Sequence, residues 1–186
     1  RCCNKTGKLP AEAIADSMEE SARQALAKAG IEASQLEWAG VGTPGTVLLG
    51  TGVISYANNL GFRDVPMREM LERRLGVPCF LANDANAAAY GELLAGAGKG
   101  AKDFIAITLG TGVGGGVIIG GRIYTGYNDA AGELGHMVIV KDGEACTCGR
   151  KGCVEAYASA TALIRQTKRA MRENPSSAGY TEVIHI

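Results

Sequence analysis

Four side chains that bind soft metal ions gather in the second half of the sequence. Cys146, Cys148 and Cys153 fall within eight residues, and His136 lies ten residues before the first of them. Three thiolates and one imidazole form a ligand set that zinc takes in tetrahedral structural sites. Three reduced cysteines and a surface histidine without a metal are the alternative, but the dense spacing favours a structural zinc ion.

Two carboxylates lie next to these predicted ligands. Glu133 comes three residues before the histidine, and Glu155 comes two residues after the last cysteine of the cluster. A metal ion that pins both segments together would hold the two carboxylates in a fixed relation, as acceptors for a polyhydroxylated ligand. Local sequence leaves open the alternative that both are ordinary solvated residues.

A glycine-rich run follows a predicted buried strand, Phe104–Leu109. It extends from Gly110 to Gly116 and contains the spacing G-x-G-x-x-G. A dinucleotide-binding turn needs a helix after it, whereas two apolar segments around Gly120-Gly121 predict a hairpin here. A glycine turn between strands can still direct backbone N–H groups at a phosphate, with the Thr111 hydroxyl as a further donor. A flexible hairpin is the alternative.

A carboxylate, Asp84, lies between a predicted strand, Val77–Leu81, and a predicted helix, Ala85–Ala95. Aspartate is common as a helix N-cap, so capping is one interpretation. Ligands of α/β sheets bind at the carboxyl ends of strands, so the second interpretation is a general base that accepts a proton from a hydroxyl group. Local sequence does not separate the two.

Hydrophobic periodicity predicts the elements that would position these side chains. An amphipathic helix is expected over Pro10–Ala29, and Asp64 is expected to cap a second helix that buries Met67, Met70, Leu71 and Leu75. The other expected elements are a strand Trp38–Val41 that leads into the turn Gly42-Thr43-Pro44-Gly45, a strand Met137–Val140, a long helix Val154–Arg172, a loop over 173–177 and the start of a strand at Val183–Ile186.

Composition restricts the class of protein. The chain has 186 residues, of which 46% are hydrophobic and 20% charged, as in soluble globular proteins. Nineteen basic residues balance nineteen acidic ones without a basic stripe, which argues against a nucleic-acid partner for this piece. No long apolar run or signal peptide is visible, so we expect no membrane partner and a cytoplasmic, reducing location.

The motifs together resemble the ROK family (repressors, open reading frames and kinases), and they cover nearly the whole chain. The resemblance is carried by Glu133-Leu134-Gly135-His136 and by the Cys-x-Cys-Gly-x-x-Gly-Cys segment Cys146–Cys153 with Val154-Glu155. The turn 42–45, the segment Asn83-Asp84-Ala85-Asn86 and the glycine run are also similar to family motifs, in the same order. The segment 55–60 is most similar to the bacterial glucokinase branch.

The resemblance implies an α/β fold of the actin-like and hexokinase-like (ribonuclease H-like) type, with two domains and a cleft between them. Residues 1–83 would form a small α/β domain that lacks its N-terminal strands and phosphate loop. Residues 84–186 would form a large α/β domain that carries the zinc loop but lacks its C-terminal part. We therefore expect this piece alone to be inactive or nearly so, and prone to aggregate.

The resemblance also implies a function, the ATP-dependent phosphorylation of a hexose, with glucose favoured. Asp84 would be the general base, Mg²⁺ would accompany ATP, zinc would be structural, and the protein would be a homodimer. The implied sugar contacts are Gly42, Gly45, Asn59, Asn83, Glu133, His136 and Glu155, and the implied ATP contacts are Gly110, Thr111, Gly112, Gly114 and Gly115.

Three alternatives stay open at the level of sequence. The same family contains sugar-responsive transcriptional repressors, whose DNA-binding segment would lie upstream. Related kinases act on N-acetylmannosamine, fructose or allose, and the loops that select among hexoses are not legible from one sequence. A purely structural zinc module is the third, but it leaves the glycine run and Asp84 unexplained.

Overall fold

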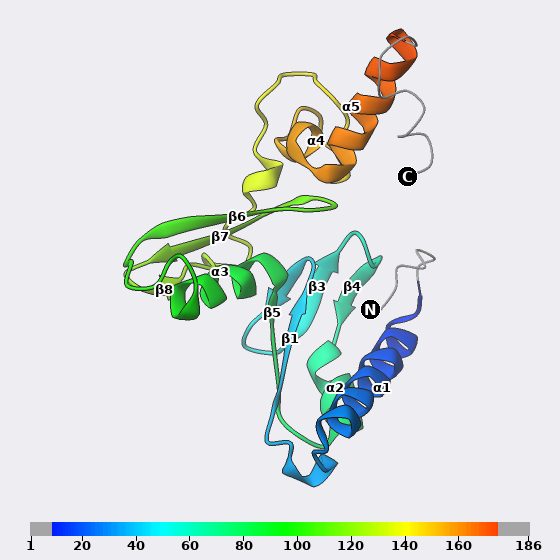
Figure 1. The fold of residues 1–186 in the computed structure, drawn as a ribbon, viewed down its shortest axis with the longest axis vertical. Helices are drawn as coiled ribbons and strands as arrows, with labels where there is room; N and C mark the ends of the chain where they lie inside the picture. The colour runs from blue at the N-terminus through cyan, green and yellow to red at the C-terminus, as the bar shows by residue number, and fades with distance from the viewer. Residues whose placement is uncertain (1–8, 175–186) are drawn as a thin grey trace.

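The computed structural model describes residues 9–174, which form a mixed α/β structure with two α/β parts and a third, looped part that ends in helices (Figure 1). The predicted strand start at 183–186 and most of the predicted loop 173–177 lie outside the described residues. Within the described residues, no helix is long and apolar enough to cross a membrane.

Two helices cover one side of the first part. Helix α1 (Ala11–Ala29) begins after Pro10 and ends at Gly30, whose φ of 67° is left-handed. Helix α2 (Met67–Leu75) ends in the same way at Gly76, with φ 71°. Glycine adopts this conformation at no steric cost, so both predicted helix ends are confirmed.

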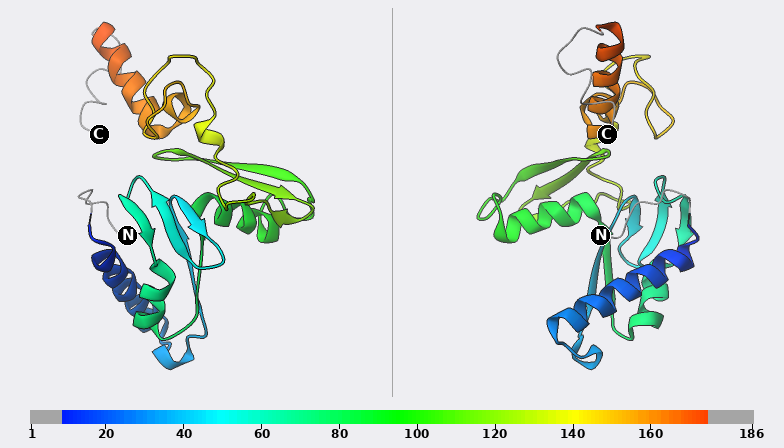
Figure 2. Two further views of the ribbon diagram at one scale, coloured as in Figure 1. Left: turned by 180° about the vertical axis from the view of Figure 1, so that it is seen from behind. Right: turned by 45° about the vertical axis from the view of Figure 1, so that its right-hand side comes forward.

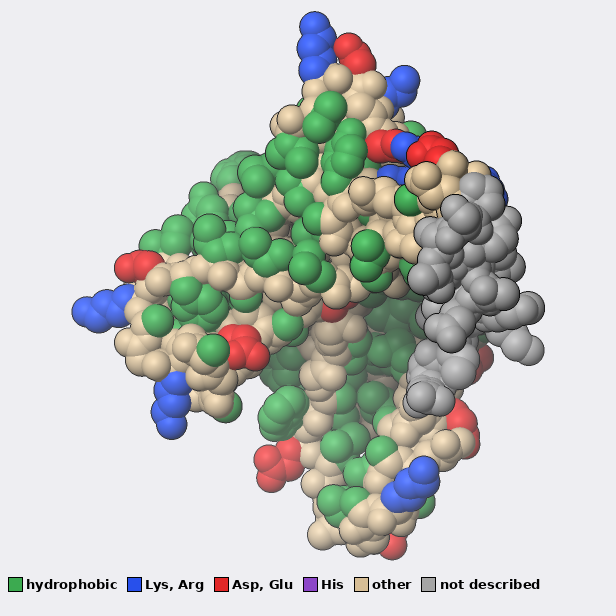
Figure 3. Space-filling model, turned by 45° about the horizontal axis from the view of Figure 1, so that its top comes forward, with side chains coloured by type: hydrophobic (Ala, Val, Ile, Leu, Met, Phe, Trp, Pro, Cys, Tyr) green, Lys and Arg blue, Asp and Glu red, His purple; other side chains and the backbone are tan. Residues whose placement is uncertain are grey.

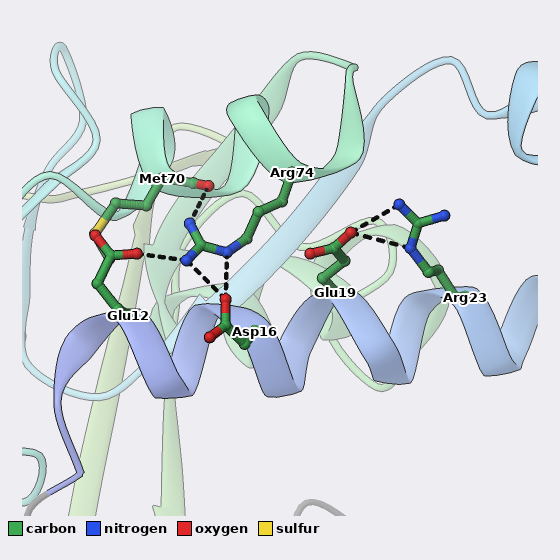
Figure 4. Close-up of polar contacts among 6 residues, drawn as sticks. All are labelled: Glu12, Asp16, Glu19, Arg23, Met70 and Arg74. Carbon is green, nitrogen blue, oxygen red and sulfur yellow. Dashed lines mark hydrogen bonds and ion pairs between the residues drawn. The ribbon is translucent and has the colours of Figure 1, made fainter.

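The two helices are joined by one arginine, shown in Figure 4. The Arg74 side chain of α2 donates to Asp16 of α1 at 2.7 and 2.9 Å and to the Met70 carbonyl at 2.9 Å, and it also pairs with Glu12. The two carboxylates raise the pKa of Arg74, with the larger effect from the hydrogen bond to Glu12 and the next from the hydrogen bond to Asp16. The contact fixes how α1 crosses α2.

Asp64 does not cap α2, so that prediction is wrong. Asp64 lies in strand β4 (Phe62–Val65) with φ 49°, and Pro66 occupies the N-cap position without a side-chain cap. A proline disfavours helical backbone in the residue before it, so the helix begins only after Pro66. The buried face of α2 is nevertheless as predicted, since Met67, Met70 and Leu71 are buried.

The strands of the first part form two small sheets around one core. Strand β1 (Ala39–Thr43) pairs in parallel with β5 (Cys79–Asn83), so that Gly42 faces Ala82 and Thr43 faces Asn83. Strands β2 (Thr46–Leu48), β3 (Val53–Ala57) and β4 form an antiparallel sheet. The core between these elements and the helices contains Ala15, Val47, Ile54, Ala57, Phe62, Met67, Met70, Leu71, Cys79 and Leu81.

Helix α3 (Asp84–Ala95) follows β5 directly and packs on a second antiparallel sheet, as Figure 2 shows from two sides. This sheet contains β6 (Phe104–Leu109), β7 (Val113–Ile119) and β8 (Arg122–Ile123) in that order. The predicted hairpin between β7 and β8 is confirmed, with positive φ at both Gly120 and Gly121.

The glycine run is not one loop, in contrast to our expectation. Only residues 110–112 form the turn, and Gly114, Gly115 and Gly116 lie within β7. A Cβ atom on Gly114 would lie 2.8 Å from the Ala85 Cβ of α3, and one on Gly116 would lie 2.9 Å from the Ala85 carbonyl oxygen. These strand glycines let the helix approach the sheet closely.

Strand β6 was predicted to be buried, but one of its faces is open. Ile105, Ile107 and Leu109 are 58%, 60% and 66% exposed, because α3 covers the opposite face of the sheet. A nearly continuous apolar run predicts a strand that is covered on both faces, yet it does not reveal which element covers the second face.

Two predictions for the last part are wrong. Met137–Val140 is not a strand, since only Val138 makes a β-bridge, with Cys153, and both Ile139 and Val140 donate to the Gly152 carbonyl. The predicted long helix is two helices, α4 (Glu155–Ala158) and α5 (Ala160–Glu173). Ser159 is extended between them and accepts from the Ala162 N–H at 3.0 Å, as the N-cap of α5.

Candidate functional site

The four predicted metal ligands converge. His136 Nδ1 lies 3.6 Å from Cys146 Sγ, and Cys148 Sγ lies 3.8 Å from Cys153 Sγ. All four ligand atoms lie within 4.8 Å of one another. A zinc tetrahedron with Zn–S bonds of about 2.3 Å has S···S edges of about 3.8 Å, so the donor set and its spacing fit that ion.

The metal loop, residues 143–153, is folded back by its own backbone. Ala145 and Lys151 form a β-bridge across it, and the Cys146 N–H donates to the Arg150 carbonyl at 2.9 Å. Gly149 and Gly152 have φ of 87° and 79°, and a side chain on Gly152 would overlap the backbone of Val140. The positive φ values of these two glycines let the loop turn back on itself.

The cluster contains one thiol that is easily ionised. Burial alone would raise the pKa of Cys148, but hydrogen bonds from the Arg150 backbone and guanidinium, and from the Cys146 and Cys153 thiols, lower this pKa to about 6. Burial raises the pKa of Cys146 to about 12. Because metal binding replaces thiol protons, a thiolate already favoured at neutral pH is a suitable first ligand.

The metal loop holds both predicted carboxylates close to the cluster. His136 directs Nδ1 toward Cys146, and its Nε2 lies 3.9 Å from a carboxylate oxygen of Glu133. Glu155, the first residue of α4, lies 3.7 Å from Cys146 Sγ and accepts from the Thr147 hydroxyl at 2.9 Å. At 3.9 Å the Glu133 contact is an ion-pair distance and not a hydrogen bond, so it places the carboxylate near the ring without bonding to it.

A second group of predicted residues meets where the parallel strands β1 and β5 end. The Asn83 side chain donates to the Gly45 carbonyl at 3.0 Å, and a Cβ atom on Gly42 would lie 3.6 Å from Asp84 Cα. Gly45 has φ 89°, and a Cβ there would lie 2.8 Å from Ala57 Cβ, so the turn needs glycine. Gly42, Gly45, Asn83 and Asp84 therefore lie together.

Asp84 is not the N-cap of α3, so one of its two interpretations is removed. Asn83 is the cap, since its Oδ1 accepts from the backbone N–H groups of Ala85 at 3.0 Å and Asn86 at 3.1 Å. Asp84 lies exposed in the first helical turn, and among the described residues its carboxylate accepts one hydrogen bond, at Oδ1 from Ala85 N at 2.9 Å.

The glycine turn is tied to the last helices rather than left flexible. The Gly110 carbonyl accepts from the Ala160 N–H, and the Thr111 carbonyl accepts from the Thr161 hydroxyl, both at 2.9 Å. Glu155 accepts from Val113 N at 3.1 Å, directly after the turn. Of the predicted ATP contacts, Gly110, Thr111 and Gly112 form this turn, whereas Gly114 and Gly115 lie in β7.

The sequence analysis did not predict two contacts of the site. Thr147 donates to Glu155, and its carbonyl accepts from the Asn58 side chain at 3.1 Å. Asn58 precedes the predicted sugar contact Asn59, which is exposed in the turn between β3 and β4. A hydroxyl residue between two predicted metal ligands is a local signal for the first contact, whereas nothing local reveals a partner 89 residues away.

A cavity of about 290 Å³ lies on another side of the α3 N-terminus. Its lining is mainly apolar, with Val47, Leu49, Ala87 and Tyr90 among its residues, and Asn83 is the one predicted site residue within it. The predicted base and metal ligands do not line this cavity. The candidate site is therefore formed by the strand ends, the glycine turn and the metal loop.

Known proteins are similar in sequence to this chain over most of its length. The glucokinase of Halalkalibacterium halodurans is 46% identical over 145 residues, which is 77% of this chain and 44% of that protein. The xylose repressor of Bacillus subtilis is 36% identical over 133 residues, or 72% of this chain and 34% of the repressor. The matched part of the chain thus spans less than half the length of the glucokinase and about a third of the length of the repressor.

Solved structures agree with the expected actin-like and hexokinase-like α/β fold. A ROK family glucokinase from Streptomyces griseus, in complex with glucose and AMPPNP, superposes with a TM-score of 0.76 at 40% identity, over 86% of this chain and 51% of that one. The model of the ROK family matches residues 3–185. Since this match includes both the strand-end residues and the metal loop, the chain belongs to the ROK family.

Proposed function

We propose that the full-length protein that carries this sequence transfers the γ-phosphoryl group of ATP to a hexose, with glucose the favoured substrate. The observation that carries this proposal is the exposed Asp84 carboxylate at the ends of β1 and β5, beside Gly42 and with Asn83 bonded to Gly45. Similarity to glucokinases supports the choice of sugar.

Asp84 is the proposed general base. Its Oδ1 is held by the Ala85 N–H, which leaves Oδ2 to accept the proton of the sugar 6-hydroxyl. The hydroxyl oxygen then bonds to the γ-phosphorus of ATP as the bond from that phosphorus to the β–γ bridging oxygen breaks and ADP leaves. Asp84 needs to be oriented for this step, and the hydrogen bond from the Ala85 N–H orients its carboxylate. The domain boundary at Asn83 stays a prediction. The proposed interdomain cleft would lie on the side of the strand ends that carries Asp84.

The sugar hydroxyls would be held from three directions. Gly42, Gly45 and Asn83 contribute the strand-end side, Asn59 contributes the turn between β3 and β4, and Glu133, His136 and Glu155 contribute the metal-loop side. These assignments follow the family resemblance. The structure supports them in part, since it groups the first three residues and, separately, the last three.

Two metal ions have different roles in this proposal. Zinc, held by His136, Cys146, Cys148 and Cys153, would be structural, since protein atoms fill all four positions. Mg²⁺ would arrive with ATP and neutralise phosphate charge, while the backbone of residues 110–112 binds the phosphates. A reducing, cytoplasmic location would keep the thiols available. A homodimer is proposed from the resemblance alone.

A sugar-responsive repressor is the second candidate, since the xylose repressor of Bacillus subtilis is 36% identical over 72% of this chain. The test is a coupled assay of ATP-dependent phosphorylation with glucose, fructose, N-acetylmannosamine and allose, with the full-length, metal-loaded protein. Glucose-selective turnover supports the kinase. Absence of turnover with every hexose, from a folded protein that still binds a sugar, would favour the repressor.

A further inference from the structure

Thr147 lies inside the metal loop but makes both of its polar contacts outside it. Its hydroxyl donates to Glu155 Oε1 at 2.9 Å, and its carbonyl accepts from Asn58 Nδ2 at 3.1 Å. The first contact reaches the start of α4, and the second reaches the turn between β3 and β4 in the other half of the described chain. Thr147 therefore connects two segments that carry proposed sugar contacts.

Glu155 is held at both of its oxygen atoms. Oε1 accepts from Thr147, and Oε2 accepts from the Val113 N–H at 3.1 Å. Hydrogen bonds to an ionised carboxylate are short and stronger than those between neutral groups. Two such bonds, one from the metal loop and one from β7 just after the glycine turn, fix the carboxylate plane. The lone pairs that remain can still accept from ligand hydroxyls.

The Asn58 contact extends this arrangement to the first part of the chain. Asn58 is adjacent to Asn59, and the Tyr56 hydroxyl donates to Asn58 Oδ1 at 3.3 Å, so the amide is oriented at both ends. The metal loop is thereby joined to the turn that carries Asn59. This is a direct hydrogen bond between the metal loop and the turn next to Asn59, over a separation of 89 residues.

We propose that Thr147 is a positioning residue for sugar recognition: its hydroxyl fixes the Glu155 carboxylate, and its carbonyl docks the turn of Asn58 and Asn59 against the metal loop. The inference rests on the proposed function, since it assumes that Glu155 accepts from a sugar hydroxyl. It assigns to the metal loop a role in sugar affinity that acts through Thr147 and not only through the metal ligands.

The experiment compares Thr147→Val with Thr147→Ser in the full-length, metal-loaded protein. Valine keeps the shape and removes the hydroxyl, whereas serine keeps the hydroxyl. Thr147→Val should weaken glucose binding, measured by calorimetry, by about tenfold, the usual size for a lost hydrogen bond to a charged group. Thr147→Ser should stay within about twofold of wild type, and both should keep their zinc and their affinity for ATP.

A double-mutant cycle tests whether Thr147 acts through Glu155. In a Glu155→Gln background, Thr147→Val should have an effect below about twofold, since the carboxylate that it positions is gone. Equal glucose affinity of Thr147→Val and wild type would overturn the proposal, as would full additivity of the two substitutions. Loss of zinc in Thr147→Val but not in Thr147→Ser would also overturn it, because the hydroxyl would then serve the loop's own fold.

A readout that needs no sugar separates this inference from the proposed function. The Val113 amide should exchange with solvent faster in Thr147→Val than in wild type or Thr147→Ser, because a carboxylate held at one oxygen protects this N–H less well. If wild type phosphorylates no hexose but shows this exchange pattern, the proposed function fails and the positioning of Glu155 stands. Unchanged exchange would remove the positioning itself.

Discussion

Cys148 illustrates what the site requires of single residues. It is exposed, whereas Cys146 and Cys153 are buried, so its side chain adds less to packing than theirs. Its thiol lies 3.8 Å from Cys153 Sγ, and hydrogen bonds from Arg150, Cys146 and Cys153 lower its pKa to about 6. Cys79 is the opposite case, a thiol 2% exposed in the core of the first part. A contribution of Cys148 to stability would therefore have to come through a bound metal ion.

Cys148→Ser should remove zinc, measured with a chelating dye on the purified full-length protein, and lower the unfolding temperature and glucose affinity. Serine is a poor zinc ligand, and the loop would lose one of four attachment points. Cys79→Ser is the control, since it should lower the unfolding temperature but keep about one zinc ion per chain. A zinc-loaded Cys148→Ser protein would contradict the assigned ligand set.

At the scale of elements, the glycines of β7 are explained by the helix above them. Gly116 is buried, and a methyl group on it would overlap Ala89 and lie 2.9 Å from the carbonyl oxygen of Ala85. Helix α3 begins with Asp84, so its depth on the sheet sets the position of the proposed base. Gly91, on the same helix, has open space where its Cβ would lie.

Gly116→Ala should lower the free energy of unfolding by roughly 1–3 kcal/mol, as expected for an added methyl group without room, and should reduce turnover by displacing α3. Gly91→Ala is the matched control and should raise the free energy of unfolding by roughly 0.5–1 kcal/mol, because alanine favours an exposed helix interior. Denaturant unfolding of the two variants measures both. Equal stability of Gly116→Ala and wild type would mean that α3 is not so closely packed.

The elements were predictable where local rules decide them. Both left-handed glycines, Gly30 and Gly76, end their helices as expected, and the convergence of the predicted metal ligands was predictable from their spacing. The errors have identifiable causes. Pro66 moved a helix start that Asp64 was expected to make, and Ser159 divided a continuous helical pattern because its side chain caps α5.

Other features depend on contacts that a single sequence does not contain. The apolar run 137–140 has strand composition, but the backbone of the metal loop takes its hydrogen bonds. Gly114 and Gly115 stay predicted ATP contacts, but the close packing of α3 on Gly114 and Gly116 could not be read from the local sequence. Asn83 and not Asp84 caps α3. Asparagine and aspartate both suit this position, so the sequence did not show which of the two neighbours is the cap.

At the scale of the molecule, an apolar surface is open on the side that carries the sheet of β6, β7 and β8, where Figure 3 shows hydrophobic side chains gathered. The exposed apolar side chains of this sheet are those of Ile105, Ile107, Leu109 and Ile119, and the side chains of Met137, Val138, Ile139 and Val140 are also exposed. Exposed apolar side chains along a strand at the edge of its sheet favour association.

The 186-residue chain should therefore self-associate at micromolar concentration, as light scattering would detect. Ile105→Thr with Ile107→Thr should reduce association without loss of helical circular dichroism, since both side chains are exposed and threonine suits a strand. Ile118→Thr, at a site 1% exposed on the same sheet, should instead destabilise the fold. A monodisperse wild-type monomer would contradict this prediction.

The most direct test of the proposed kinase is the turnover of Asp84→Asn in the full-length protein with glucose and ATP. Asparagine keeps an oxygen for the Ala85 N–H and removes the base, so kcat should fall at least about 100-fold while glucose affinity, measured by calorimetry, changes little. Asp129→Asn is the control, because the Asp129 carboxylate accepts from the Leu49 N–H and is no part of the proposed site. The kcat of this variant should stay within about twofold of wild type. An Asp84→Asn enzyme with wild-type kcat would contradict the account.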